Sequence, residues 1–140
     1  MAGQAASEHA SGGSLYVAIS NAIVGTLREY TGRGPSRART TIRDNVVVVL
    51  LEQQLTKGEQ SLVAKGRADK VLEIRHEYQM AMREECIAKV SALTGRKVIA
   101  MMSGNHLEPD LGCEIFVLEE SLDRASLSAD MDGNGALPVE

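Results

Sequence analysis

The stretch ARTTIRDNVVVVLL, residues 38–51, decides the fold of this 140-residue chain. Both of its halves are rich in β-branched residues, which favour strands. Between them lies Arg43-Asp44-Asn45, and Asp and Asn tolerate the dihedral angles of a tight turn. The pattern predicts a β-hairpin. The unbroken apolar run Val46–Leu51 is typical of a strand buried at the centre of a sheet.

An amphipathic helix is predicted before this hairpin. Ser14 is a suitable N-cap, Gly32 lies where a helix would end, and Pro35 prevents the helix from continuing. Apolar residues recur three or four positions apart and form one stripe, which is the signature of a helix with one buried face. The stripe consists of Leu15, Ile19, Ala22, Ile23, Thr26, Leu27 and Tyr30.

Two further helices are predicted after the hairpin. The first opens at Leu55-Thr56, where Glu59 follows Thr56 at the spacing of a capping box, and it closes near Gly66. The second runs from about residue 68 to about residue 93 and stops at Gly95. Its predicted inner face consists of Val71, Ile74, Tyr78, Met82, Ile87, Val90 and Leu93.

A second hairpin is predicted near the end of the chain. Its strands are Lys97–Ser103 and Cys113–Glu119, and the segment GNHLEPDLG joins them. The predicted order is therefore helix, two strands, two helices and two strands. Strands joined by short loops pair antiparallel. This order predicts a two-layer α+β domain, in which a four-stranded antiparallel sheet made of two hairpins carries helices on one face.

The length predicts one domain, which we place at residues 14–120. Residues 1–13 are mostly Ala, Gly and Ser and are predicted to be a disordered head, and residues 121–140 are predicted to be a flexible acidic tail. Net charge follows this division, because residues 1–13 sum to −1, residues 14–118 to +2 and residues 119–140 to −5. The domain itself is therefore mildly basic.

The cellular location is predicted from the lack of a membrane span and of a secretory signal in the sequence. The longest apolar run is Val46–Leu51, far shorter than the roughly 20 residues that a membrane span needs. The first thirteen residues have neither a basic start nor an apolar stretch, so they do not read as a secretory signal. We expect a soluble, cytoplasmic protein. A helix as long as the predicted second one often overhangs its sheet, and self-association through it would make a homodimer.

Arginines concentrate in TGRGPSRARTTIR, residues 31–43. Arginine grips phosphate or carboxylate with a planar fork of donors, and glycine lets backbone amides approach an anion. On an extended segment, Arg37, Arg39 and Arg43 share one face. The predicted ligand-binding residues, for a nucleotide or another phosphate-bearing ligand, are Arg33, Gly34, Arg37, Arg39 and Arg43.

Two alternatives to this anion site exist. The arginines can be solvated, or they can pair with Glu52, Glu114 or Glu119 on neighbouring strands. Nucleic acid does not suit the segment, because it lacks nearby aromatic residues for base stacking and the domain lacks a strongly basic field. The GRGP sequence also lacks the Lys-Ser/Thr ending of a Walker phosphate loop.

Other chemistry-bearing residues give weaker signals. His106 with Asp110 could form a metal pair or an acid–base pair, but Gly, Asn, Pro and Asp in the same segment also suit a plain turn. Cys86 lies ten residues after His76, about 15 Å along a helix, too far for activation. Cys113 could meet His106 only by folding of the loop. We predict no catalytic residue, no metal and no cofactor.

The end of the tail resembles half of a calcium-binding loop. Asp130, Asp132 and Asn134 have the expected offsets, and Gly135 follows. The closing Glu would fall one position after Glu140, so a flexible acidic end is the favoured interpretation, with weak calcium binding left open.

Several short segments, taken together, resemble the MpsC-like domain, a small prokaryotic family formerly of unknown function. It is named for a proposed Na⁺-translocating, membrane-potential-generating system. The resemblance covers about residues 14 to 120, nearly all of the predicted domain. The segments are ISNAIV, TGRGP with Arg37 and Arg39, LT with Glu59 and Leu62, Arg75, LTGRKV and PDLGCEIFVLE.

The resemblance implies a small, often stand-alone protein, associated in some members with membrane systems thought to take up bicarbonate or sodium. It implies no catalytic signature. Three hypotheses follow. The first is a non-enzymatic accessory or regulatory protein that binds a membrane complex. The second is an anion- or nucleotide-binding module that uses Arg33, Arg37 and Arg39, and the third is an enzyme built around His106 and Asp110.

Overall fold

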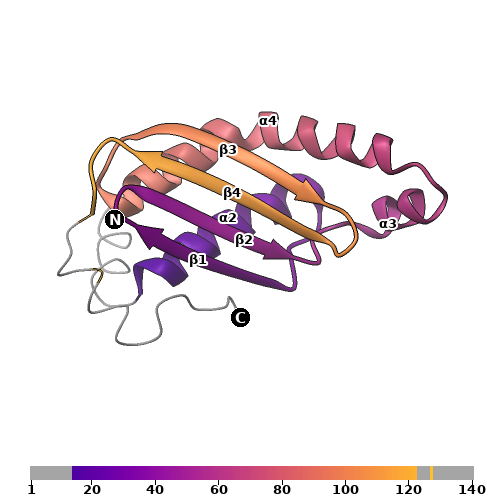
Figure 1. The fold of residues 1–140 in the computed structure, drawn as a ribbon, viewed down its shortest axis with the longest axis horizontal. Helices are drawn as coiled ribbons and strands as arrows, with labels where there is room; N and C mark the ends of the chain where they lie inside the picture. Colours follow the sequence, from indigo (N-terminus) through magenta and orange to yellow (C-terminus); the bar gives the residue numbers. More distant parts are fainter. Residues whose placement is uncertain (1–13, 123–126, 128–140) are drawn as a thin grey trace.

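The computed structural model describes residues 14–122 and residue 127. Within these residues the order of elements is α-β-β-α-α-β-β, which confirms the predicted order (Figure 1). The helices are α2 (Leu15–Thr31), α3 (Lys57–Ala64) and α4 (Ala68–Thr94); the strands are β1 (Arg37–Arg43), β2 (Val46–Glu52), β3 (Val98–His106) and β4 (Leu111–Leu118). The predicted disordered head, most of the predicted tail and the candidate calcium loop lie outside the described residues.

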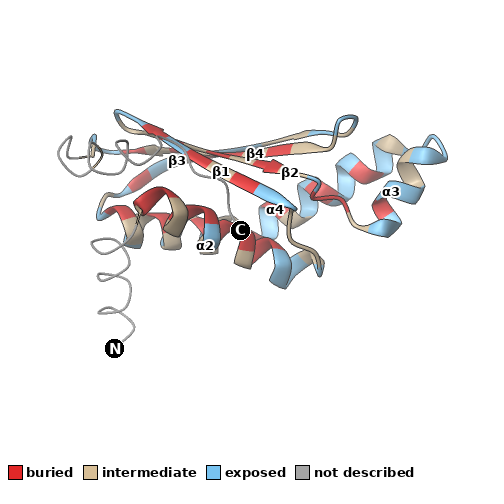
Figure 2. Ribbon diagram, turned by 90° about the horizontal axis from the view of Figure 1, so that it is seen from below, coloured by how far each residue is buried: buried red, intermediate tan, exposed pale blue. Residues whose placement is uncertain are grey.

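The sheet has the strand order β1-β2-β4-β3, and every neighbouring pair is antiparallel. The prediction that Val46–Leu51 forms a central strand is confirmed, since β2 pairs with both β1 and β4. The two hairpins are thus joined through β2 and β4, and β1 and β3 form the edges. Helices α2 and α4 lie on one face of the sheet, as Figure 2 shows, which confirms the two-layer α+β fold.

Local signals place the helix ends where the sequence predicts them. The Ser14 hydroxyl accepts a hydrogen bond from the Val17 amide, and Gly32 ends α2 in the left-handed conformation at a φ of 79°. Glu59 and Thr56 form a complete capping box at the start of α3. Gly95 ends α4, also with a left-handed φ.

The second hairpin has longer strands and a tighter turn than predicted. Strand β3 continues through Gly104, Asn105 and His106, which pair with Cys113, Gly112 and Leu111. These residues have little intrinsic preference for strands, but the backbone ladder satisfies their N–H and C=O groups. Only residues 107–110 are left to form the turn.

The core lies between the sheet and the pair α2 and α4. Alternate residues of β2 and β4 point into it, together with the buried stripe of α2. Leu122 and Leu127 also pack against this core, although both follow residue 120. The buried apolar residues of the cluster are Leu15, Tyr16, Ile19, Ile23, Val24, Leu27, Ala38, Ile42, Val47, Val49, Leu51, Met82, Cys86, Val90, Val98, Met101, Phe116 and Leu118.

The inner face of α4 differs from the predicted one. Ile74 is 38% exposed, whereas its neighbour Arg75 is 1% exposed. Arg75 and Gln79 take inward positions because each finds a hydrogen-bonding partner outside α4, and the Thr94 hydroxyl donates to the Val90 carbonyl of its own helix. Of the predicted residues, Val71, Met82 and Val90 are buried; Arg75, Gln79, Cys86 and Thr94 complete the buried set. Helix α4 also extends past the end of the sheet, toward α3 (Figure 1).

Candidate functional site

The predicted arginine segment divides between two places in the fold. Arg37, Arg39 and Arg43 occupy alternate positions of β1 and share the face of the sheet that is turned away from the helices. Arg33 lies before β1, and its Nη2 donates a hydrogen bond to the backbone oxygen of Gln53 at 3.1 Å. The structure therefore does not place Arg33 on the same strip as the other three.

The acidic partners predicted for these arginines lie on different faces of the sheet. Arg37 and Arg39 both approach Glu52, with N–O distances of 4.0 Å and 3.7 Å. Glu114, another predicted partner, is buried on the helix side of the sheet and cannot reach them. Ion pairs at this degree of exposure contribute little to stability, about 0–1 kcal/mol.

Gly34 allows the side chain of Arg28 to pack closely against the backbone. A Cβ at this position would lie 2.7 Å from Nη2 of Arg28, so the Arg28 guanidinium occupies the space that a side chain would need. The close approach predicted for an anion is thus made by an arginine of the same chain.

The face of the sheet turned away from the helices, here called the outer face, is apolar over three of its strands. In an antiparallel sheet with one face in solvent, outward residues are normally polar. Across the outer face, Thr41, Val48, Ile115 and Met102 form one row from β1 to β3, and Met102 is 51% exposed. Among the paired strand positions the outward apolar residues are Val46, Val48, Leu50, Ala100, Met102, Leu111, Cys113, Ile115 and Val117, and Ile99, at the register shift in β3, is also exposed.

Charge borders this apolar area along one side. The column of Arg37, Arg39 and Arg43 on β1 flanks it, and Glu52 is the acid that shares their face within β1 and β2. The outer face thus combines an apolar centre with a basic margin. This is the composition of a recognition surface, in which apolar contact gives affinity and charge gives orientation.

A pocket of about 440 Å³ lies at the opposite end of β2 from the Asp44-Asn45 turn. It is formed by the loop after α2, the loop after β2, helix α3 and the β3–β4 turn. Its volume is within the range of small-molecule sites. The lining residues are Arg33, Gln53, Leu55, Gln60, Val63, Ala64, Leu107, Glu108 and Asp110.

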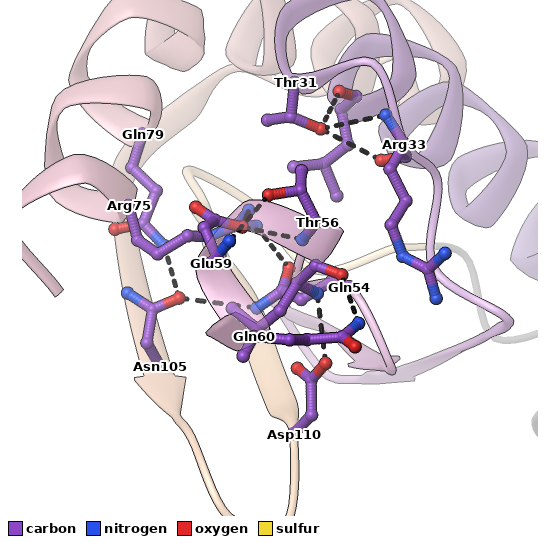
Figure 3. Close-up of polar contacts among 12 residues, drawn as sticks. Thr31, Arg33, Gln54, Thr56, Glu59, Gln60, Arg75, Gln79, Asn105 and Asp110 are labelled. Atoms are coloured by element: carbon purple, nitrogen blue, oxygen red, sulfur yellow. Dashed lines mark hydrogen bonds and ion pairs between the residues drawn. The ribbon is translucent and has the colours of Figure 1, made fainter. Parts of the chain in front are cut away.

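A buried polar network lies next to this pocket, between α3, α4 and the sheet (Figure 3). Arg75 is bonded through Nη1 to Glu59 at 3.2 Å and through Nη2 to the side-chain oxygen of Gln54 at 2.8 Å. Asn105 accepts hydrogen bonds from Gln79 at 3.0 Å and from Gln54 at 3.4 Å. The network joins the loop after β2 to α3, α4 and β3, and these hydrogen bonds hold the wall of the pocket in place.

Gly112 makes room for this network. A Cβ at Gly112 would overlap the side-chain amide of Gln54. The glycine is therefore required by the close approach of Gln54.

Glu114 is the most perturbed carboxyl group among the described residues. It is 2% exposed, and burial raises its pKa to about 7, although a hydrogen bond from Ser103 and the charge of Arg75 act in the opposite direction. Burial likewise raises the pKa of the Cys86 thiol to about 12, and it raises that of Cys113. Neither thiol is activated as a nucleophile.

The predicted pair of His106 and Asp110 is engaged in the β3–β4 turn. Nδ1 of His106 lies 2.8 Å from the backbone oxygen of Pro109, and Oδ2 of Asp110 accepts a hydrogen bond from the Leu55 amide at 3.0 Å. These contacts favour the turn interpretation. Within residues 14–122 and 127 the structure brings together no group of three His, Cys, Asp or Glu residues that could hold a metal ion.

Sequence reasoning missed the buried network, the pocket and the apolar outer face. The partners of Arg75 come from the loop after β2 and from α3, and such distant pairings leave no periodic signal in the sequence. Among the described helices, none has both the length and the apolar character needed to cross a membrane.

Comparison with known proteins gives one match. A family described as the Na⁺-translocating membrane potential-generating system (MpsC) matches residues 11–120 of the chain. No curated protein and no solved structure matches significantly.

Proposed function

Because the chain belongs to the MpsC family, we propose that it is a non-enzymatic accessory protein of a Na⁺-translocating, membrane-potential-generating system. It acts by binding a protein component of that system through its outer face. The observation that carries this proposal is the apolar area of β2, β3 and β4 on the side of the sheet away from the helices.

A partner that covers this apolar area would gain binding free energy from it. Val48 and Ile115 are neighbours at its centre, and Met102 beside Ile115 is half exposed. Each apolar side chain that a partner covers contributes about 25 cal/mol per Å² of area removed from water. Contiguous apolar surface of this kind marks interaction sites, because a sheet face without a function in binding would gain solubility from polar residues.

The basic margin specifies the chemistry of the partner. Arg37, Arg39 and Arg43 share a face with Glu52 as their acid, so the margin has surplus positive charge. A segment with an apolar centre and acidic residues along one side would satisfy both parts of the surface. A second copy stacked on this face would bring three more arginines and only one more acid, Glu52, so the positive charge would remain in surplus. For a homodimer, the exposed apolar side chains of α4, Leu72, Ile74 and Met80, offer a better surface.

The experiment compares two methionines of similar exposure. Met102 is 51% exposed on the outer face, and Met80 is 56% exposed on α4. The full chain, tagged and expressed in its own cells, is purified from detergent-solubilised membranes, and the subunits of the Na⁺-translocating system are quantified by mass spectrometry. Met102→Lys should reduce recovery of those subunits by about tenfold or more, equivalent to about 1.4 kcal/mol, whereas Met80→Lys should leave it unchanged.

Two results would count against the proposal. One is equal recovery of the subunits with wild type and Met102→Lys, provided both proteins are folded by circular dichroism. The other is flotation of the purified wild-type chain with protein-free anionic vesicles to the same extent as with native membranes, because this would assign the outer face to lipid.

Anion binding is a second candidate function. Arg37 and Arg39 converge on one carboxylate, that of Glu52, which leaves positive charge for a phosphate-bearing ligand. Binding to the folded state raises the melting temperature by mass action. A thermal-shift panel of inorganic phosphate and nucleotides should then show a rise that Arg37→Ala removes, and the absence of a shift with every anion would refute this candidate.

A further inference from the structure

The pocket beside α3 contains two charged side chains of opposite sign with unused hydrogen-bonding capacity. Nε of Arg33 and Oδ1 of Asp110 are shielded from solvent, and neither has a hydrogen-bond partner among the described residues. A polar group that is shielded and unpaired costs about 1–3 kcal/mol. Both side chains line the pocket, so the parts of them that face it are candidates for contacts with a ligand.

Both side chains are also held in position. Arg33 is tethered through Nη2 to the Gln53 carbonyl, and Asp110 is tethered through Oδ2 to the Leu55 amide. Each tether leaves further capacity in the group, namely the other Nη donors of the guanidinium and the second lone pair of Oδ2. The backbone N–H of Gln53 donates a hydrogen bond to the backbone oxygen of Asp110 at 2.9 Å, and this bond joins the two walls of the pocket. This fixed placement lowers the entropy lost when a ligand binds.

The charges of the lining restrict the ligand. Arg33 is the cation of the lining, and Glu108 and Asp110 are its acids. A simple anion would meet two carboxylates, and a simple cation would meet the guanidinium. A ligand that carries one positive and one negative group matches both signs. The rest of the wall includes the apolar side chains Leu55, Val63 and Leu107, which suit an aliphatic chain.

From this lining we propose that the pocket binds a free aliphatic α-amino acid. Arg33 receives its carboxylate, Asp110 and Glu108 receive its ammonium group, and Leu55, Val63 and Leu107 cover its side chain. The site lies at the β3–β4 turn and α3, away from the centre of the outer face, so it is independent of the proposed partner surface. It would make the protein responsive to a small metabolite.

The test uses L-leucine and its two halves as probes. Isopentylamine lacks the carboxylate of leucine, and 4-methylpentanoate lacks its ammonium group. Isothermal titration calorimetry with the full chain should give saturable binding of leucine at least about tenfold tighter than of either half, which corresponds to about 1.4 kcal/mol. Valine and isoleucine are titrated in the same way, to include aliphatic side chains of other shapes.

Variants locate the site. Arg33→Gln and Asp110→Asn should each weaken leucine binding by about tenfold or more; the asparagine keeps an oxygen for the Leu55 amide. Arg37→Gln is the matched control, because Arg37 lies on the outer face, and it should bind leucine as wild type does. If a variant fails to fold, methyl resonances of Leu55 and Val63 in the wild-type protein report the site, and they should shift on addition of leucine.

The following results would overturn the proposal. The first is that leucine, valine and isoleucine all fail to bind, in which case the pocket holds water. The second is that 4-methylpentanoate or isopentylamine binds as tightly as leucine. The third is that leucine binding is unchanged in both Arg33→Gln and Asp110→Asn. None of these results would affect the Met102→Lys comparison, so failure of this proposal is distinguishable from failure of the partner-binding proposal.

Discussion

Raising the pH from about 5 to about 8 should weaken the fold through one carboxyl group, that of Glu114. This side chain is buried on the helix side of β4, where burial raises its pKa to about 7. In the unfolded chain the carboxyl is hydrated and keeps the ordinary value of 4.5. The folded protein therefore holds this proton more tightly than the unfolded chain does. The stabilisation is fully present below the unfolded pKa and is lost as the pH rises through the folded one.

The magnitude follows from the two pKa values. At about 1.4 kcal/mol for each pKa unit, a rise from 4.5 to about 7 corresponds to about 3 kcal/mol of folding free energy. The loss falls almost entirely between those two pH values. Small domains are stable by only about 5–15 kcal/mol, so this loss is measurable.

Urea denaturation at a series of pH values tests this prediction, with Glu114→Gln as the reference variant. Glutamine has nearly the same shape and keeps an oxygen for the Ser103 hydroxyl, but it does not titrate. All other titrating groups are common to both proteins, so their effects largely cancel in the difference. The stability of wild type relative to Glu114→Gln should fall by about 3 kcal/mol between about pH 4 and about pH 8.

A flat difference over this range would refute the reasoning, because it would mean that Glu114 has the same pKa in the folded and unfolded states. If wild type instead gained stability relative to Glu114→Gln as the pH rises, the charge of Arg75 and the hydrogen bond from Ser103 would outweigh burial, and folding would lower the pKa of Glu114.

The remaining predictions concern the buried network and its cap. Arg75→Met should lower the free energy of unfolding by about 3–5 kcal/mol, because it leaves the Glu59 carboxylate buried without its cation. Adding Glu59→Gln should restore part of the lost stability, and an equal loss in the single and double variants would contradict this explanation. Gly112→Ala should lower the free energy of unfolding by about 1–3 kcal/mol, because the new Cβ displaces Gln54 from Arg75. An unchanged melting temperature would show that Gln54 can move without loss of stability. Thr56→Ala should cost about 1 kcal/mol in urea denaturation, whereas Thr56→Ser should keep the capping box, so an equal loss in both would exclude the hydroxyl as its cause.

Most of the fold could be predicted because its signals are local. The β-branched flanks of the Asp44-Asn45 turn and the Thr56–Glu59 spacing each depend on a few neighbouring residues, and the structure confirms both. The inner face of α4 could not be predicted in the same way. Apolar periodicity selects Ile74, but Arg75 is buried there because Glu59 and Gln54 reach it from other elements.

The candidate sites could be predicted only in part. The shared face of Arg37, Arg39 and Arg43 follows from the two-residue period of a strand, and it is found. The run Val46–Leu51 indicates burial on both faces of β2, yet the described helices cover one face. Sequence cannot distinguish a face covered by the same chain from one covered by a partner, because both require apolar residues. The pocket depends on loops that converge from four parts of the chain.

A natural thiol offers the most direct measurement on the proposed partner surface. Cys113 lies half-buried on the outer face between Leu50 and Gly104, whereas Cys86 is fully buried in the core and serves as the internal control. The alkylation rate of Cys113 with N-ethylmaleimide is measured by mass spectrometry in the isolated chain and in the purified complex with its membrane partner. We expect the partner to slow the reaction of Cys113 by about tenfold or more, with Cys86 unreactive in both samples. An equal rate for Cys113 in the free and bound chain would contradict it.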